Sequence, residues 1–191
     1  GAVFSGNAGA HALAGLDGHG EIGAEAGLVV PAHGRELKLF GQLRGQTQAD
    51  QAPAVSNHEI DDFRGDELGG SEVQTVFFGG GTPSLLSPRI IGLTMERINK
   101  YFRLVPKAEV TLEANPESLR GGHRAAQYLD AGINRLSIGV QSMDEGMLRL
   151  LGRPHKAQDS LHVAFLAREA GCTNINLDLM WGLPGQSVSQ W

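Results

Sequence analysis

The sequence has a single cysteine, Cys172, among its 191 residues. One thiol cannot form a disulfide within the chain, and it cannot alone supply the several thiolates that hold an iron–sulfur cluster. Cys172 follows a predicted helix end and precedes a predicted strand, and unpaired cysteines are among the most buried residues in proteins. We therefore expect Cys172 to be a small hydrophobic residue of the core.

Positive charge is also scarce. The net charge of −5 leaves no broad basic surface for nucleic acid. No apolar run approaches the roughly 20 residues that a membrane helix needs, and the first residues lack the basic segment of a signal peptide. We therefore expect a cytoplasmic globular protein with no nucleic-acid partner and no membrane span.

Histidines in a metal-ligand spacing are missing as well, so we assign the chain no metal-binding residue. The six that receive no role are His11, His19, His33, His58, His123 and His162.

Long periodic segments are absent from the first 70 residues, which hold 14 of the 27 glycines. Residues 36–40 alternate like a short strand, but residues 46–62 are polar and resemble a linker. We expect residues 1–70 to be an unassigned Gly/Ala-rich segment, either disordered or mis-translated, and residues 71–191 to form the folded domain. The chain also stops in what resembles the start of a further strand-to-helix loop.

The most informative stretch is residues 76–84, in which an apolar run ends in three glycines followed by Thr82 and Pro83. Apolar residues that favour strands, followed by glycines, predict a buried strand that ends in a tight loop. Because glycine has no Cβ, such a loop lets the backbone approach a ligand closely.

Three further strands are predicted after the first, each ending near a polar residue and a Gly, Pro or Ser: residues 109–116, 135–142 and 174–184. Helical patterns lie between them. We predict helices from Pro88 with Ser87 as N-cap, over 118–131, from a capping box at Ser142–Glu145 to Gly152, and from about Leu161 to Gly171. This alternation predicts an α/β fold with a parallel sheet, whose ligands bind at the carboxyl ends of the strands.

Five motifs occur in an ordered series: GGGTPSLLS, EANPES, NRLSIGVQS, LGRPH and NLDLMWGLPGQ. The series resembles the oxygen-independent coproporphyrinogen III oxidase family of radical S-adenosylmethionine (SAM) proteins. It is most similar to the heme chaperone branch, HemW, over about residues 71–191. The resemblance implies a partial radical SAM (β/α)6-type barrel, incomplete at both ends, with SAM across the carboxyl ends of its strands.

The same resemblance implies seven cofactor-binding positions and no catalytic residue in the chain. The glycine loop would contact the methionine part of SAM, Arg153 its carboxylate, and Asp178 the ribose. The full set is Gly80, Gly81, Thr82, Glu113, Gln141, Arg153 and Asp178. These types suit an ammonium, a carboxylate, a sulfonium and ribose hydroxyls.

Plainer roles compete with some of these assignments. Arg153 could form a surface ion pair, and Asp178 could cap the next element. Asn115 with Pro116 is typical of a helix start rather than of a ligand, and we expect His155 to be structural or exposed. A conventional SAM methyltransferase also has a glycine loop and an acidic residue after the next strand, so Glu113 alone does not exclude one.

The family's [4Fe–4S] cluster needs a C-x3-C-x2-C loop before Gly79, and the sequence has none. A degenerate relative and a reading-frame or gene-boundary error both explain this. At family level the resemblance implies a radical SAM protein of porphyrin or heme metabolism with heme or a porphyrinogen as partner. We expect these residues alone to be inactive. The alternative is a cluster-free SAM-binding remnant without catalysis.

Overall fold

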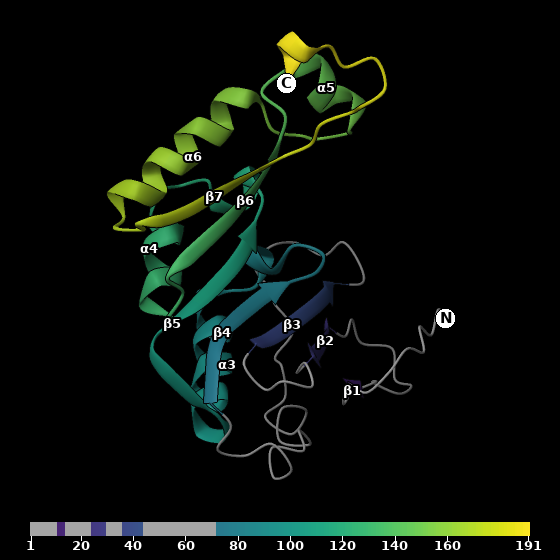
Figure 1. Cartoon of the computed structure of the whole chain (residues 1–191). Helices are drawn as coiled ribbons and strands as arrows, with labels where there is room; N and C mark the ends of the chain where they lie inside the picture. The colour runs from purple at the N-terminus through teal and green to yellow at the C-terminus, as the bar shows by residue number, and fades with distance from the viewer. Residues whose placement is uncertain (1–10, 14–23, 30–35, 44–71) are drawn as a thin grey trace.

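The computed structural model describes residues 11–13, 24–29, 36–43 and 72–191, which contain one seven-stranded sheet with the strands in sequence order (Figure 1). The strands are β1 (His11–Leu13), β2 (Ala24–Val29), β3 (Glu36–Leu43), β4 (Glu72–Gly79), β5 (Arg103–Ala114), β6 (Arg135–Gln141) and β7 (Asn174–Leu179). The helices are α3 (Pro88–Tyr101), α4 (His123–Asp130), α5 (Glu145–Leu150) and α6 (Ala157–Glu169). Three 3-10 turns are η1 (Pro83–Leu85), η2 (Pro116–Leu119) and η3 (Val188–Gln190).

Strands β4 to β7 are parallel and each pairs with the next, which confirms the α/β fold with a parallel sheet. The sheet also continues toward the N-terminus: β3 pairs with β4 in parallel, whereas β1 pairs with β2 and β2 with β3 in antiparallel fashion. We predicted only a brief alternating strand there. Strand β3 pairs with β4, which is distant in sequence, so local alternation could not reveal that β3 extends the parallel sheet.

One face of the sheet is covered by α3, α4 and α6 (Figure 1). Alternate side chains of the strands point into this layer, as the two-residue period of a strand requires. Fully buried members of the core include Val76, Leu112, Leu136, Ile138 and, from α4, Tyr128. Cys172 is also a buried member of this core, as predicted.

The helix starts follow local capping chemistry. Ser87 accepts from the backbone N–H of Ile90 at 3.3 Å and begins α3, as predicted. The predicted helix over 118–131 is shorter: α4 begins at His123, because Gly121 and Gly122 adopt positive φ and separate it from η2. The predicted capping box at Ser142 is wrong, because the N-cap of α5 is Asp144, whose Oδ1 accepts from Met147 N at 2.9 Å.

Helix α6 buries its smaller residues and leaves two of its largest hydrophobic residues exposed. Its buried residues are the small ones, Ser160, Val163 and Ala167, whereas Leu161 and Phe165 are exposed. Small residues let the helix lie close to the sheet.

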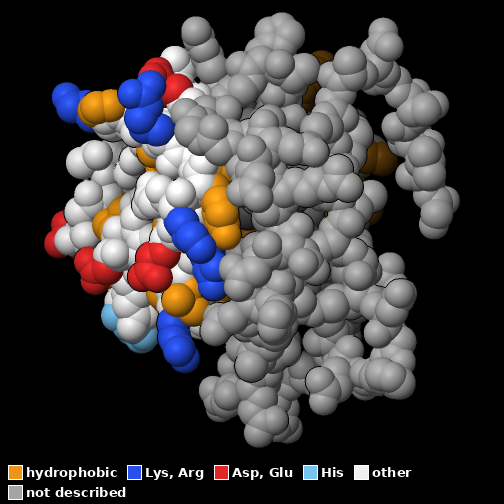
Figure 2. Space-filling model, turned by 90° about the horizontal axis from the view of Figure 1, so that it is seen from below, with side chains coloured by type: hydrophobic (Ala, Val, Ile, Leu, Met, Phe, Trp, Pro, Cys, Tyr) orange, Lys and Arg blue, Asp and Glu red, His pale blue; other side chains and the backbone are white. Residues whose placement is uncertain are grey.

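The opposite face of β5 and β6 is polar. On β5 and β6 it presents Glu109, Thr111 and Glu113 beside Arg135 and Ser137. Figure 2 shows acidic, basic and hydrophobic side chains intermixed on the described part of the face seen from below.

No helix within the described ranges is long and apolar enough to span a membrane.

Candidate functional site

The glycine loop and Glu113 meet at the carboxyl ends of β4 and β5. The backbone N–H of Gly80 donates to Glu113 Oε2 at 3.1 Å. Gly80 and Gly81 have φ of 82° and 60°, in the left-handed region that favours glycine. The loop therefore turns sharply over a half-buried carboxylate, whose other oxygen has no hydrogen bond within the described part of the chain.

Gly79 explains how the carboxylate fits so close to the loop. A Cβ at this position would lie 2.6 Å from Phe77 Cε1 and 3.2 Å from Glu113 Oε2. A larger residue would therefore have to displace the Phe77 ring, the carboxylate or both. The first glycine of the motif, Gly79, therefore serves packing, whereas Gly80 and Gly81 serve the backbone turn.

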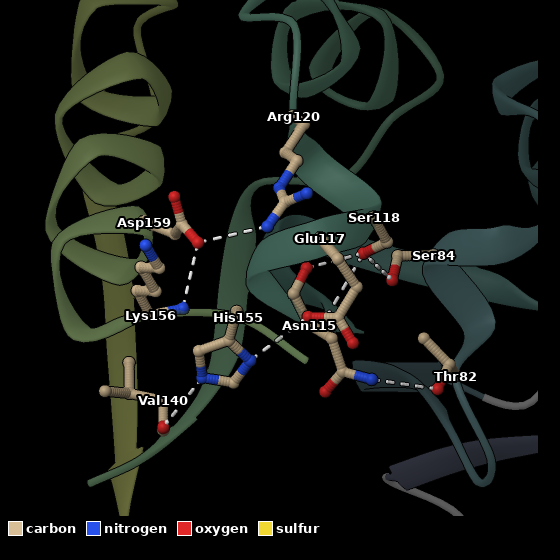
Figure 3. Close-up of polar contacts among 10 residues, drawn as sticks. All are labelled: Thr82, Ser84, Asn115, Glu117, Ser118, Arg120, Val140, His155, Lys156 and Asp159. Carbon is tan, nitrogen blue, oxygen red and sulfur yellow. Dashed lines mark hydrogen bonds and ion pairs between the residues drawn. The ribbon is translucent and has the colours of Figure 1, made fainter. Parts of the chain in front are cut away.

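The loops that follow β4 and β5 are joined by side-chain hydrogen bonds, as Figure 3 shows. Asn115 Nδ2 donates to Thr82 Oγ1 at 3.1 Å, and the hydroxyls of Ser84 and Ser118 lie 2.7 Å apart. The hydroxyl of Tyr128 in α4 lies 2.6 Å from the Ser84 carbonyl oxygen and donates to it. The loop that contains Thr82 and Ser84 is therefore held by residues from the loop after β5 and from α4.

Gln141 ends β6 in an unusual backbone conformation. Its φ is 67°, and the N–H of Ser142 donates to the carbonyl of Val140 at 2.9 Å, so Gln141 is the central residue of a γ-turn of the rare, strained kind. A Cβ at Gly139 would lie 2.7 Å from Gln141 Nε2 and 3.0 Å from Asn115 Oδ1. The two amides therefore share the space above Gly139.

Asp178 lies on β7 and faces the same side of the sheet. Ser137 Oγ donates to its Oδ2 at 2.9 Å, and Asn176 Nδ2 donates to its Oδ1. Asn176 also donates to Ser137 Oγ at 3.1 Å. Two neighbouring donors therefore fix the orientation of a carboxylate that remains exposed.

Arg153 follows α5. Gly152, with φ of 65°, ends that helix, and the N–H of Arg153 donates to the Leu148 carbonyl at 2.9 Å, as in a Schellman motif. Among the described residues, no hydrogen bond or ion pair of its guanidinium is found.

The structure therefore connects some predicted residues more closely than others. Direct bonds join Gly80 to Glu113 and Thr82 to Asn115, and Asn115 adjoins Gln141 above Gly139. Asp178 is oriented by neighbours on β6 and β7 rather than by these residues. The sequence interpretation gave no role to Ser137, although it alternates with Leu136 and Ile138 along β6 and so had to face the site.

Metal-ligand chemistry is sparse in the described ranges. No group of three or more His, Cys, Asp or Glu side chains there could hold a metal ion. Burial raises the pKa of the Cys172 thiol, which keeps it protonated, whereas metals bind the thiolate. With a single cysteine in 191 residues, the chain does not fit a cluster held by three thiolates.

The sequence of this chain is similar to those of known proteins. The model of the radical SAM superfamily matches residues 61–191, starting before the predicted boundary at residue 71. The mouse protein "Radical S-adenosyl methionine domain-containing protein 1, mitochondrial" is 48% identical over 123 residues, which are 64% of this chain and 28% of that protein. The heme chaperone HemW of Escherichia coli is 46% identical over 121 residues, 63% of this chain and 32% of that protein.

Among solved structures, coproporphyrinogen III oxidase (HemN) from Escherichia coli aligns with a TM-score of 0.60 and 27% identity, covering 75% of this chain and 35% of that one. The chain thus spans about a third of the length of these relatives. The family model covers more than half of the chain, and the glycine loop and its carboxylate partner lie within the matched residues. The chain therefore belongs to the radical SAM superfamily.

Proposed function

We propose that this chain is the SAM-binding part of a heme-chaperone-type radical SAM protein of porphyrin or heme metabolism. The observation that carries the proposal is the bond from Gly80 N–H to Glu113 Oε2. It places a carboxylate beside a backbone without Cβ atoms, at the strand ends where parallel barrels bind ligands.

The chemistry of the donor set fits SAM. In the proposed site, Glu113 takes the ammonium group with the oxygen that does not bond Gly80, and the loop from Gly80 to Thr82 lies along the methionine part. The guanidinium of Arg153, which has no bonded partner among the described residues, is suited to the carboxylate. Gln141 offers an amide that both donates and accepts, and Asp178 accepts from ribose hydroxyls.

When it is bound beside a reduced [4Fe–4S] cluster, SAM supplies the radical chemistry for which the superfamily is named. The 191 residues do not provide the three thiolates of such a cluster. We therefore assign only binding and orientation to this chain and propose that it is inactive alone.

The partner and the compartment are proposals as well. Relatives carry the descriptions "Heme chaperone HemW" and "Coproporphyrinogen III oxidase", so heme or a porphyrinogen is the proposed partner of the complete protein. We propose a cytoplasmic location, and the mitochondrion named for the mouse relative is the competing compartment.

Calorimetric titration of SAM into the 191-residue chain tests the site. Glu113→Ala removes a charged hydrogen-bonding group worth about 1.5–3 kcal/mol, so we expect binding to weaken roughly 10- to 100-fold. Glu109→Ala is the matched control, because Glu109 lies on the same strand and face but interacts with Arg135 instead. Arg153→Ala should also weaken binding. Equal affinity of the Glu113 variant and the control would disprove the site assignment.

The single cysteine favours a second candidate, a cluster-free SAM-binding remnant without catalysis. Sequencing the coding DNA across residues 1–70 and upstream separates the two. A C-x3-C-x2-C loop in another reading frame would indicate a scrambled copy of a working radical SAM protein. Its absence from a verified, expressed frame would favour the remnant.

A further inference from the structure

His155 is a buried polar residue outside the set of proposed SAM-binding residues. Its side chain has no exposed surface, although it lies in the loop between α5 and α6, two residues after Arg153. Figure 3 shows the ring between the end of β6 and the turn η2. Nε2 lies 3.1 Å from the carbonyl oxygen of Val140, and Nδ1 lies 3.2 Å from Glu117 Oε2. We predicted a structural or exposed histidine, and it is buried and bonded at both nitrogens.

Both partners of the ring are acceptors. A carbonyl oxygen and an ionised carboxylate cannot donate, and a neutral imidazole carries only one N–H. Both bonds form together when the ring carries two protons, which makes the contact with Glu117 a charge-assisted hydrogen bond. In this form His155 is a double donor that bridges two strand-end loops.

The Val140 carbonyl is a meaningful partner because it closes the γ-turn at Gln141. It accepts from Ser142 N within the turn and from His155 Nε2 outside it. This carbonyl belongs to the same peptide plane as the N–H of Gln141. A donor that fixes the plane therefore helps hold Gln141 at its φ of 67°, which a non-glycine residue adopts only when its surroundings enforce it.

The hydrogen bond to Glu117 connects His155 to the same site through a second loop. Glu117 lies in η2, which starts just after Asn115, and Asn115 holds Thr82 and adjoins the Gln141 amide. His155 thus spans the two loops whose amides share the space above Gly139.

We propose that His155 is a positioning residue of the SAM site, which holds the γ-turn at Gln141 so that the Gln141 amide faces the ligand. This inference rests on the proposed function, because the ligand that benefits is the proposed SAM. The bond to Val140 carries the effect, and the bond to Glu117 orients the ring.

Two substitutions separate these bonds. The amide nitrogen of glutamine is as many bonds from Cα as Nε2 of histidine, so His155→Gln can still donate to the Val140 carbonyl. The amide nitrogen of asparagine corresponds to Nδ1, so His155→Asn can reach Glu117 but not Val140. His162→Gln, on the exposed side of α6, is the control for loss of a histidine.

The first measurement needs no ligand. In 1H–15N spectra of the full chain, we expect His155→Asn to speed exchange of the Ser142 amide about tenfold, because the turn that protects it loosens. The side-chain amide signals of Gln141 should shift as well. His155→Gln and His162→Gln should resemble the wild type. Unchanged Ser142 exchange and Gln141 signals in His155→Asn, or equal changes in both His155 variants, would overturn the proposal.

The second measurement is SAM affinity. We expect His155→Asn to weaken binding about tenfold and His155→Gln less than about threefold. In a Gln141→Gly background, where glycine keeps the turn without an amide, His155→Asn should cause no further loss. An additive loss there would show that His155 does not act through Gln141. If the wild type does not bind SAM, the proposed function fails together with the ligand half of this inference, and the spectra still decide whether His155 holds the turn.

Discussion

The two faces of the sheet differ in what their side chains can do. On the helix-covered face, Leu112, Leu136 and Ile138 have no exposed surface and no polar atoms to satisfy. On the opposite face of the same strands, Glu113 is hydrogen-bonded to Gly80 and Ser137 to Asp178. Residues one position apart therefore pack in the core or carry polar groups according to the face on which they lie.

This division has a physical reason. Burial of apolar area stabilises the fold wherever helices exclude water from the sheet, whereas carboxylates remain charged only where water or hydrogen bonds compensate them. Substitutions on the covered face should therefore change mainly the free energy of unfolding, and substitutions on the polar face mainly ligand affinity.

The sharpest test of the covered face is Leu112→Ala. The side chain is completely buried at the centre of the sheet, so the lost contacts and the cavity should lower the free energy of unfolding by about 2–5 kcal/mol. Urea denaturation followed by circular dichroism measures this change. Glu113→Gln, one residue further along and on the other face, is the control and should cost far less. If the two variants lost equal stability, the division between the faces would be wrong.

A smaller effect is expected for Tyr128→Phe, which removes a hydroxyl bonded to the carbonyls of Ser84 and Leu86. Leaving these acceptors without a donor should cost about 1–3 kcal/mol. Burial raises the pKa of the Tyr128 phenol, so its contribution is fully present below the unfolded-state value of about 10 and is lost as the pH rises through the folded-state value.

Denaturation of wild type and Tyr128→Phe at about pH 8 and about pH 11 measures this dependence. The stability difference between the two proteins should shrink at the higher pH. A difference that grew with pH would contradict the assignment of the protonated phenol as the stabilising form.

The smallest effect on stability is expected on the polar face, for Gly139→Ala. The added Cβ would come too close to the flexible ends of Gln141 and Asn115, at 2.7 and 3.0 Å, and would make an ordinary contact with the Ala114 carbonyl oxygen at 3.7 Å. These amides can move, so the free energy of unfolding should change by less than about 1 kcal/mol while SAM affinity falls several-fold. Calorimetry and urea denaturation of the same sample compare the two. Gly92→Ala, where a Cβ has more room, is the control. Unchanged affinity would remove Gln141 from the proposed site.

Much of this arrangement was predictable from sequence because strand and helix signals are local. The glycine loop after β4, the N-cap at Ser87 and the burial of Cys172 all follow from the residues themselves. The start of α4 was misplaced because the pattern from Ser118 onward is helical in period. The helical turn there is a 3-10 turn, ended by the two glycines with positive φ.

Such local patterns could not predict contacts between residues that are distant in sequence. The bond between His155 and Val140 crosses 15 residues, and that between Asn115 and Thr82 crosses 33. The positive φ of Gln141 was also hidden, since glutamine carries no preference for it. Only tertiary partners enforce this conformation, so only the structure reveals it.

The two hydrogen-bonded links between the loops after β4 and β5 have a consequence for how this protein can change. Loops at the end of a parallel sheet can usually vary in length independently of one another. Here a residue inserted between Thr82 and Ser84 would disturb the partners of both Asn115 and Ser118. The two loops should therefore accept changes in length only as a pair. An insertion in one loop would be tolerated only together with a matching change in the other.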